Sequence, residues 1–284
     1  MSRLRILVRE RRGESPAGSA VELTVDVPGD PIKDEPGTVV FRWPPTGESR
    51  LMLKVYRRWN IVHWMRKRLT GFRVRREFRA LVLLREAGVE CVDPVFWGIG
   101  WAPDQGRFEV LATREVAAAG RLSEAVAAQP REVRREVLGR LFESVARMHR
   151  AGVYHGAPFL GNVLASATNG APPPLCILDL EKSVCFGRDI RGTRMAEFDL
   201  VNLVRSIRTR VGRADARAAL QHYGLDEIGV DGIGAAADAY RSSKFQRSRR
   251  HVEFLVRGWL TRRRGGASRP PHDESDLVGR EYCP

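Results

Sequence analysis

Lys54 and Glu77 are the first residues whose types and setting suggest chemistry. Lys54 lies in an apolar run that predicts a strand, and an amine buried there is costly unless it meets an anion. Glu77, in the next predicted helix, supplies a carboxylate. A strand lysine held by a helix glutamate is suited to contacting the α- and β-phosphates of a nucleotide. The alternative is that the two residues do not pair: the lysine then extends to solvent, and the glutamate neutralises neighbouring arginines.

Asn162 and Asp179 form a second group. Asn162 follows a loop that begins at His155, and Asp179 ends an apolar strand. Amide and carboxylate oxygens are hard ligands, and two of them from two loops suit a Mg²⁺ ion that bridges nucleotide phosphates. Each residue alone is equally typical of a turn or a strand-end cap. The ordered set with Lys54 and Glu77 favours the nucleotide interpretation.

The secondary structure predicted around these side chains changes along the chain, from mainly strands to mainly helices. The first part predicts strands at Val21–Val27, Gly37–Trp43, Arg50–Tyr56, Val95–Gly100 and Phe108–Arg114, with one helix at Arg75–Ala87. The second part predicts helices at Leu122–Ala128, Arg131–Arg150, Glu197–Arg210, Arg213–His222 and Ala235–Arg263, with short strands at Val163–Ala165 and Leu175–Leu178. Residues 1–32 otherwise read as an irregular leader. We therefore expect an α+β chain with a β-rich lobe (1–116), a helical lobe (117–264) and a disordered tail (265–284).

Composition limits the classes of protein. The 284 residues carry 48 basic and 34 acidic side chains, a net charge of +14, which favours anionic partners. No apolar run approaches the ~18 residues of a membrane-spanning helix, and the N-terminus has no secretory apolar segment. The four cysteines lack the paired short spacing of a zinc site or disulfide scaffold. We expect a cytoplasmic protein, with any membrane contact peripheral and at the inner face of the cytoplasmic membrane.

Six stretches of the sequence, in this order, carry a resemblance to a known family. They are Leu53–Arg58, Arg76–Leu81 with Ala87–Val89, Met148–Gly156, Asn162–Leu164, Ile177–Lys182 and Asp199–Ser206. Together they resemble the kinase-like fold, and most closely the lipopolysaccharide core kinases, the Kdo and heptose kinase family. The resemblance covers about residues 35–225. It implies a two-lobed protein-kinase-like fold and ATP/Mg²⁺-dependent phosphorylation of a sugar hydroxyl in lipopolysaccharide core or a related glycolipid.

The resemblance also implies a role for each matching residue. Lys54 would contact the α- and β-phosphates, and Glu77 would orient it. Asp179 would bind the Mg²⁺ ion, and Asn162 would hold the metal from the other side. His155 would be a structural histidine of the catalytic loop. The hinge that receives adenine through backbone groups would comprise Thr113, Arg114, Glu115 and Val116.

Ala157 departs from the family pattern, which has an aspartate two residues after the loop histidine. A methyl group cannot accept the acceptor hydroxyl's proton, and general-base assistance is typically worth ~10²–10⁴-fold in rate. Phosphoryl transfer relies largely on positioning and charge stabilisation, so this loss slows transfer more than it abolishes it. Three explanations stay open: a natural pseudokinase, a kinase that recruits another base, or an engineered substitution. Glu181 is a candidate substitute base or metal ligand, and is otherwise an exposed turn residue.

The glycine loop that covers the nucleotide phosphates is a second departure. Between the first two strands of the lobe only Gly37 and Gly47 are available, which gives a poor backbone cradle. This weakens a protein-kinase interpretation more than a sugar-kinase one. The alternative function is a pseudokinase that binds nucleotide as a regulatory or scaffold module.

Two basic segments with interleaved aromatic residues, Arg57–Arg73 and Arg241–Arg264, have helical spacing. Such helices can lie in a membrane interface, or can pack on the protein with a solvated basic face. The expected partners are a nucleotide and a phosphorylated or sugar-rich glycolipid, with an anionic membrane surface in addition. No RNA- or DNA-binding motif is present, so nucleic acid is not an expected partner.

Overall fold

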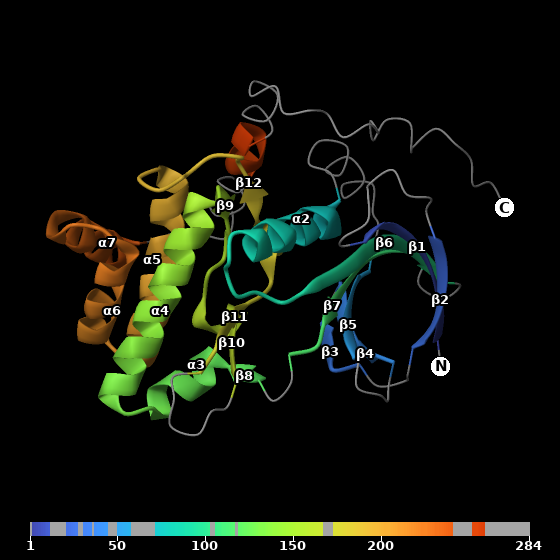
Figure 1. The fold of residues 1–284 in the computed structure, drawn as a ribbon, viewed down its shortest axis with the longest axis horizontal. Helices are drawn as coiled ribbons and strands as arrows, with labels where there is room; N and C mark the ends of the chain where they lie inside the picture. The colour runs from blue at the N-terminus through green and yellow to red at the C-terminus, as the bar shows by residue number, and fades with distance from the viewer. Residues whose placement is uncertain are drawn as a thin grey trace. The chain divides into compact units, whose positions relative to one another are not determined.

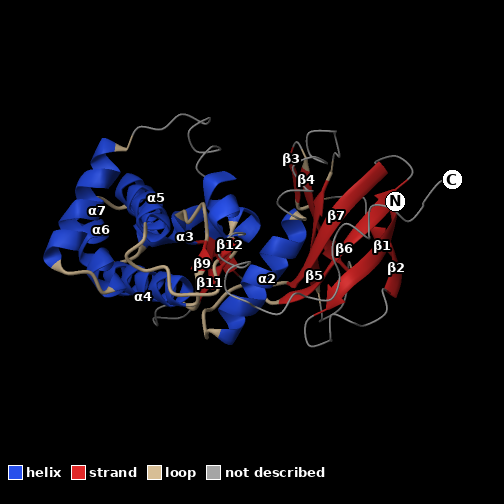
Figure 2. Cartoon of the chain, turned by 90° about the horizontal axis from the view of Figure 1, so that it is seen from above, coloured by secondary structure: helices blue, strands red, loops and turns tan. Residues whose placement is uncertain are grey.

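The computed structural model describes residues 2–11, 21–27, 31–35, 37–44, 50–57, 72–102, 106–116, 119–166, 173–240 and 252–258. The chain forms two compact units. The first comprises residues 1–78, 93–115 and 262–284, and the second comprises 79–92 and 116–261. Strands dominate the first unit and helices the second (Figures 1 and 2), which confirms the predicted α+β class.

The first unit is built on a seven-stranded antiparallel sheet with the order β2-β1-β6-β7-β5-β4-β3. The strands are β1 (Ser2–Arg11), β2 (Val21–Val27), β3 (Lys33–Glu35), β4 (Thr38–Trp43), β5 (Leu51–Tyr56), β6 (Pro94–Ala102) and β7 (Gly106–Arg114). Alternate residues of these strands form one apolar cluster that includes Ile6, Leu53, Phe108 and Val110. Burial of one face explains the period-two pattern of strands such as β1 and β4, whereas β7 is buried on both faces from Phe108 to Thr113.

Strand β1 corrects the prediction of an irregular leader. It is ten residues long and pairs with β2 on one side and β6 on the other. Leu4, Ile6 and Val8 alternate along it and are all buried. Arg5 interrupts the apolar run, and Arg3 and Arg9 flank it. They do not disturb the period-two alternation of buried residues, which is the relevant signal for a half-buried strand.

Helix α2 (Arg73–Glu86) follows in the chain and carries Glu77. Its first turn is fixed by the buried Glu109 of β7, whose Oε2 accepts a hydrogen bond from the Val74 backbone N–H at 3.1 Å. A carboxylate at a helix N-terminus satisfies an otherwise unpaired donor and is favoured by the helix dipole. The helix is followed by Gly88 at φ 69°, a left-handed stop that suits glycine.

The second unit is mainly helical. Its helices are α3 (Leu122–Ala125), α4 (Arg131–Arg150), α5 (Arg194–Arg210), α6 (Arg213–Leu220) and α7 (Glu227–Ala239), with short 3₁₀ turns η1 (Val126–Ala128), η2 (Leu160–Asn162), η3 (Leu180–Lys182) and η4 (Gln221–Tyr223). One small sheet has the order β11 (Leu175–Ile177), β10 (Val163–Ser166) and β8 (Ala119–Arg121). A second pairs β9 (Val153–Tyr154) with β12 (Val184–Cys185). Helix α4 has the predicted bounds.

The predicted helix Ala235–Arg263 is wrong in its bounds. Helix α7 begins at Glu227, where the Asp226 carboxylate accepts a hydrogen bond from the Gly229 N–H at 2.8 Å, and it ends at Ala239. Three glycines in α7 weaken the helical pattern, and the cap offsets part of that cost. A separate helix spans 252–258.

Two apolar residues of the 252–258 helix belong to the core of the second unit. Phe254 and Leu255 are buried in a cluster with Tyr154, Val184 and Ile190. These side chains therefore serve folding and are not available to a membrane. The rest of the basic segment 241–264, nearly all of the segment 57–73 and the predicted disordered tail 265–284 lie outside the described residues. Among the described helices, none has the length and apolar composition needed to span a bilayer.

Candidate active site

In the first unit, Lys54 and Glu77 form an ion pair. The Lys54 Nζ donates to Glu77 Oε1 at 3.1 Å and to Oε2 at 3.4 Å. The Glu77 side chain is only 3% exposed, while that of Lys54 is 19% exposed. A buried carboxylate needs charged or hydrogen-bonding partners to be tolerated. The pair therefore fixes the lysine, and the partial exposure of Lys54 leaves its ammonium group able to meet an anion.

Tyr56 is a further partner of Glu77 that sequence reasoning missed. Its hydroxyl donates to Glu77 Oε2 at 2.8 Å. Because alternate residues of a strand share a face, Tyr56 and Lys54 of β5 both point toward α2. The Arg73 guanidinium lies over the Tyr56 ring, 4.8 Å from its centroid. The period-two spacing of Tyr56 from Lys54 is the sequence signal by which this residue could have been found.

The predicted hinge begins at the end of β7. Thr113 is buried and pairs with Met52 of β5. The Glu115 backbone N–H donates to the Arg50 carbonyl at 3.0 Å, and the Glu115 carboxylate pairs with Arg42 Nη2 at 2.6 Å. The backbone amide and the side chain of Glu115 are therefore both occupied by contacts within the protein. At this residue, the backbone carbonyl is the group that can contact adenine. Val116, the last hinge residue, is grouped with the second unit.

In the second unit, the buried Asp199 of α5 holds the start of the loop that contains the other predicted residues. Its Oδ2 accepts from the His155 backbone N–H at 2.7 Å, and its Oδ1 accepts from the Gly156 N–H at 3.0 Å. Its Oδ2 also lies 3.2 Å from His149 Nε2. Asp199 and His149 are fully buried. Sequence reasoning placed both in matching stretches and gave neither a role.

Gly156 is required by the loop's close approach to the segment after Asp179. Its φ is 84°, in the left-handed region. A Cβ built there would lie 2.8 Å from the Lys182 carbonyl oxygen. Any side chain at this position would push the loop away from residues 180–183.

His155 is buried beside the loop. Burial lowers the pKa of its imidazole, against the opposing effect of the Asp199 and Asp179 charges. The ring is therefore neutral at pH 7, and its Nδ1 accepts a hydrogen bond from the Ala157 N–H at 3.4 Å. This contact matches a structural histidine that shapes the loop.

Ala157 and Asn162 are tied together. The Ala157 side chain is buried, and its carbonyl accepts from Asn162 Nδ2 at 2.9 Å and from the Phe159 N–H at 3.0 Å. The Asn162 carbonyl in turn accepts from the Leu178 N–H at 3.1 Å. Since Leu178 immediately precedes Asp179, the backbone brings the two predicted metal ligands into neighbouring loops.

Asp179 has φ 65° and ψ 49°, and it is the one residue other than glycine with a positive φ in the described part of the chain. A left-handed conformation costs an aspartate roughly 1 kcal/mol, and strain of this kind concentrates at functional sites. Glu181 lies two residues later in the η3 turn and is half-buried.

The residues present fit a Mg²⁺–nucleotide complex. Hydrogen bonding of Asn162 Nδ2 to Ala157 orients the side-chain amide and leaves Oδ1 as its ligand atom. Mg²⁺ is commonly bound by one or two protein oxygens together with substrate phosphates. Asn162 and Asp179 of the second unit supply oxygens of that kind. Within the first unit, taken by itself, Lys54 is a cation of the type that binds phosphates.

Comparison with known proteins gives a family and a structure of similar fold. A sequence model of the lipopolysaccharide kinase (Kdo/WaaP) family matches residues 41–223. A solved structure, WaaP in complex with acyl carrier protein, is similar with a TM-score of 0.57 and 21% identity, covering 75% of this chain and 88% of that one. No curated protein matches. The structural likeness confirms the two-lobed kinase-like fold, and the family match covers well over half of the residues. The chain belongs to the lipopolysaccharide kinase (Kdo/WaaP) family.

Proposed function

We propose that this protein transfers the γ-phosphoryl group of ATP, with Mg²⁺, to a sugar hydroxyl of lipopolysaccharide core or a related glycolipid. The family match supports the sugar-kinase reaction. The observation that carries the nucleotide part is the ion pair between Lys54 and the buried Glu77, because it presents a fixed ammonium group. In this proposal Lys54 contacts the α- and β-phosphates, while Asn162 and Asp179 hold the metal.

The proposed transfer proceeds without a carboxylate at position 157. The acceptor oxygen bonds to the γ-phosphorus while the bond from phosphorus to the bridging oxygen breaks, and ADP leaves. The hydroxyl proton passes to solvent or to the transferred phosphoryl group, because the Ala157 methyl cannot accept it. Loss of a general base costs ~10²–10⁴-fold, so slow transfer is expected.

The alternative is a pseudokinase that binds nucleotide as a regulatory or scaffold module, and Ala157 is the observation that favours it. Binding needs Lys54, Glu77 and the metal ligands, all of which are present. WaaP was solved in complex with acyl carrier protein. A pull-down with that carrier protein tests whether this chain takes the same kind of partner in either role.

Transfer of label from γ-labelled ATP to purified lipopolysaccharide core acceptors tests the proposal. Native protein should label the acceptor, and Asp179→Asn should abolish labelling. Asp189→Asn is the matched control, since Asp189 is an exposed aspartate that pairs with Arg191. Labelling equal in native protein and Asp179→Asn would contradict the metal role.

Ala157→Asp separates the two functions. A gain of about 10²-fold in transfer, with ATP affinity unchanged, identifies an impaired or inactivated kinase. Efficient native transfer with no gain assigns the proton transfer to another group, and Glu181→Gln should then lower the rate. Nucleotide binding by both forms without transfer to any acceptor leaves the pseudokinase function.

A further inference from the structure

Three buried polar side chains form a continuous hydrogen-bonded series in the second unit. The Tyr223 hydroxyl, in η4, lies 2.8 Å from Nδ1 of His149, which is on α4. Nε2 of His149 lies 3.2 Å from Asp199 Oδ2. Asp199 then holds the backbone N–H groups of His155 and Gly156. The series therefore runs from η4 to the start of the loop that carries Ala157 and Asn162.

The direction of these hydrogen bonds follows from the chemistry of the groups. A carboxylate is an acceptor, so His149 must donate to Asp199 from Nε2. In a neutral imidazole Nδ1 is then the acceptor, and the Tyr223 hydroxyl is the donor. Burial raises the pKa of the Tyr223 phenol, so the hydroxyl keeps the proton that it donates. The Asp199 carboxylate therefore sets the tautomer of His149, and the Tyr223 hydroxyl holds the other ring nitrogen by donating to Nδ1.

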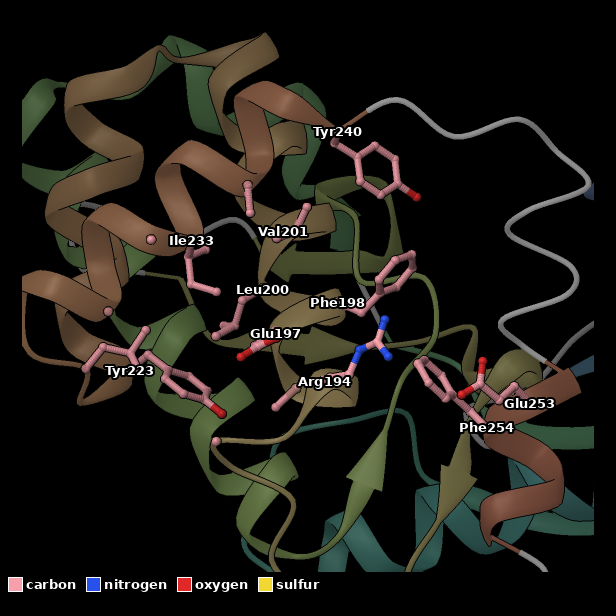
Figure 3. A pocket seen from close by; sticks show the side chains of 16 residues that line it. Arg194, Glu197, Phe198, Leu200, Val201, Tyr223, Ile233, Tyr240, Glu253 and Phe254 are labelled. Atoms are coloured by element: carbon pink, nitrogen blue, oxygen red, sulfur yellow. The ribbon is translucent and has the colours of Figure 1, made fainter.

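The ring of Tyr223 has a separate role in packing. It lines a cavity of about 540 Å³ with residues of α5 and α7, among them Leu200 and Ile233. Figure 3 shows the ring at the edge of this cavity with its hydroxyl directed toward the ribbon of α4. The ring also meets His149 edge-on, with 5.6 Å between centroids. Replacing Tyr223 by Phe keeps the ring and removes only the hydroxyl.

We propose that Tyr223 is a positioning residue for the loop: its hydroxyl donates to Nδ1 of His149 and fixes the orientation of the ring, and His149 thereby holds the Asp199 carboxylate against the His155 and Gly156 amides. The effect on catalysis rests on the proposed phosphotransferase function. The effect on the loop does not, because it concerns hydrogen bonds that are present without substrate.

Tyr223→Phe tests the loop directly. In native protein the ring ¹⁵N spectrum should show His149 as the Nε2–H tautomer with Nδ1 hydrogen-bonded. In the variant the tautomer should be kept, and the Nδ1 resonance should shift toward that of an imidazole nitrogen that accepts no hydrogen bond. Amide hydrogen exchange at His155 and Gly156 should become at least about threefold faster in the variant, while buried amides of α4 keep their native rates. Tyr240→Phe is the matched control, since Tyr240 lines the same cavity, and it should change neither measurement. An unchanged Nδ1 resonance, or an equal rise in exchange at every buried amide, would overturn the proposal.

The kinetic measurement uses the same variants. If native protein transfers phosphate, Tyr223→Phe should lower kcat about threefold to tenfold and leave the KM for ATP within about twofold. In a His149→Gln background the same change should have no further effect, because the two residues act in series. Additive losses would overturn the proposal. If native protein shows no transfer, the proposed function fails, and the Nδ1 resonance and the exchange rates still decide the role of Tyr223.

Discussion

The two units hold their candidate functional groups in different ways. In the first unit, Lys54, Tyr56 and Glu77 are joined through side chains, and a strand and a helix supply them. In the second unit, Asp199 holds the start of the loop through the backbone amides of His155 and Gly156. Substitution at position 157 is therefore compatible with an intact loop, because the hydrogen bonds from Asp199 do not involve that side chain.

The largest effect is expected from loss of the buried Asp199 carboxylate, which acts as a clamp on the His155 and Gly156 amides. Asp199→Asn replaces a carboxylate that accepts three hydrogen bonds by an amide with one acceptor oxygen. A lost hydrogen bond to a charged group costs about 1.5–3 kcal/mol, so the free energy of unfolding should fall by about 3 kcal/mol. Tm should drop by about 6–10 °C in a thermal melt.

Asp231→Asn is the control for the clamp. Asp231 forms an exposed ion pair with Arg217, which is worth at most about 1 kcal/mol. Its Tm should stay within about 3 °C of the native value. Equal shifts for the two variants would show that the loop does not depend on Asp199.

The next effect in size concerns nucleotide binding by the first unit. ATP with Mg²⁺ should raise the Tm of native protein, because a ligand that binds the folded state stabilises it, and Lys54→Met should remove that rise. Lys33→Met is matched to it, since Lys33 is a partly exposed lysine of the same sheet that pairs with Glu35. Titration calorimetry should find ATP binding in that control. Native affinity in Lys54→Met would assign the Lys54–Glu77 pair to folding alone.

The sequence predicts the first unit's pair better than the second unit's clamp, for a physical reason. Lys54 and Glu77 are charges in apolar surroundings, and a buried charge implies a partner. Asp199 is one of several polar residues on an amphipathic helix, and its partners are backbone amides 44 and 43 residues away. Backbone donors carry no sequence signature, so only the fold reveals them.

The same reasoning explains two other differences between prediction and structure. Strand β1 was missed because its short apolar run is flanked and interrupted by Arg3, Arg5 and Arg9, although Leu4, Ile6 and Val8 keep the spacing of a buried face. The apolar residues Phe254 and Leu255 suggested a membrane surface, but they complete the core of the second unit. Periodicity indicates which residues share a face, and only packing shows what covers it.

A smaller effect is expected from Tyr56→Phe, which removes one of the donors to Glu77 and keeps Lys54 in place. One hydrogen bond to a charged, buried carboxylate is worth about 1.5 kcal/mol. The KM for ATP should rise severalfold with little change in kcat, and steady-state kinetics at varied ATP separates the two. If KM and Tm both keep their native values, the Tyr56 hydroxyl contributes nothing to holding Glu77.

The smallest effect is a pH dependence of stability that belongs to the second unit. Burial lowers the pKa of His155 below its ordinary value of 6.5, so the unfolded chain binds the proton more readily than the folded one. The stability from neutral His155 is therefore complete above about pH 7 and is lost as pH falls through 6.5. Thermal melts between pH 8 and 5 should show a lower Tm at the acidic end, and His155→Asn should reduce that slope even if it lowers Tm throughout.

His222→Asn is the control, because His222 is exposed and pairs with Glu143 at the surface, and it should retain the native slope. Equal slopes in native protein and His155→Asn would show that the loop histidine is not the group that links folding to pH.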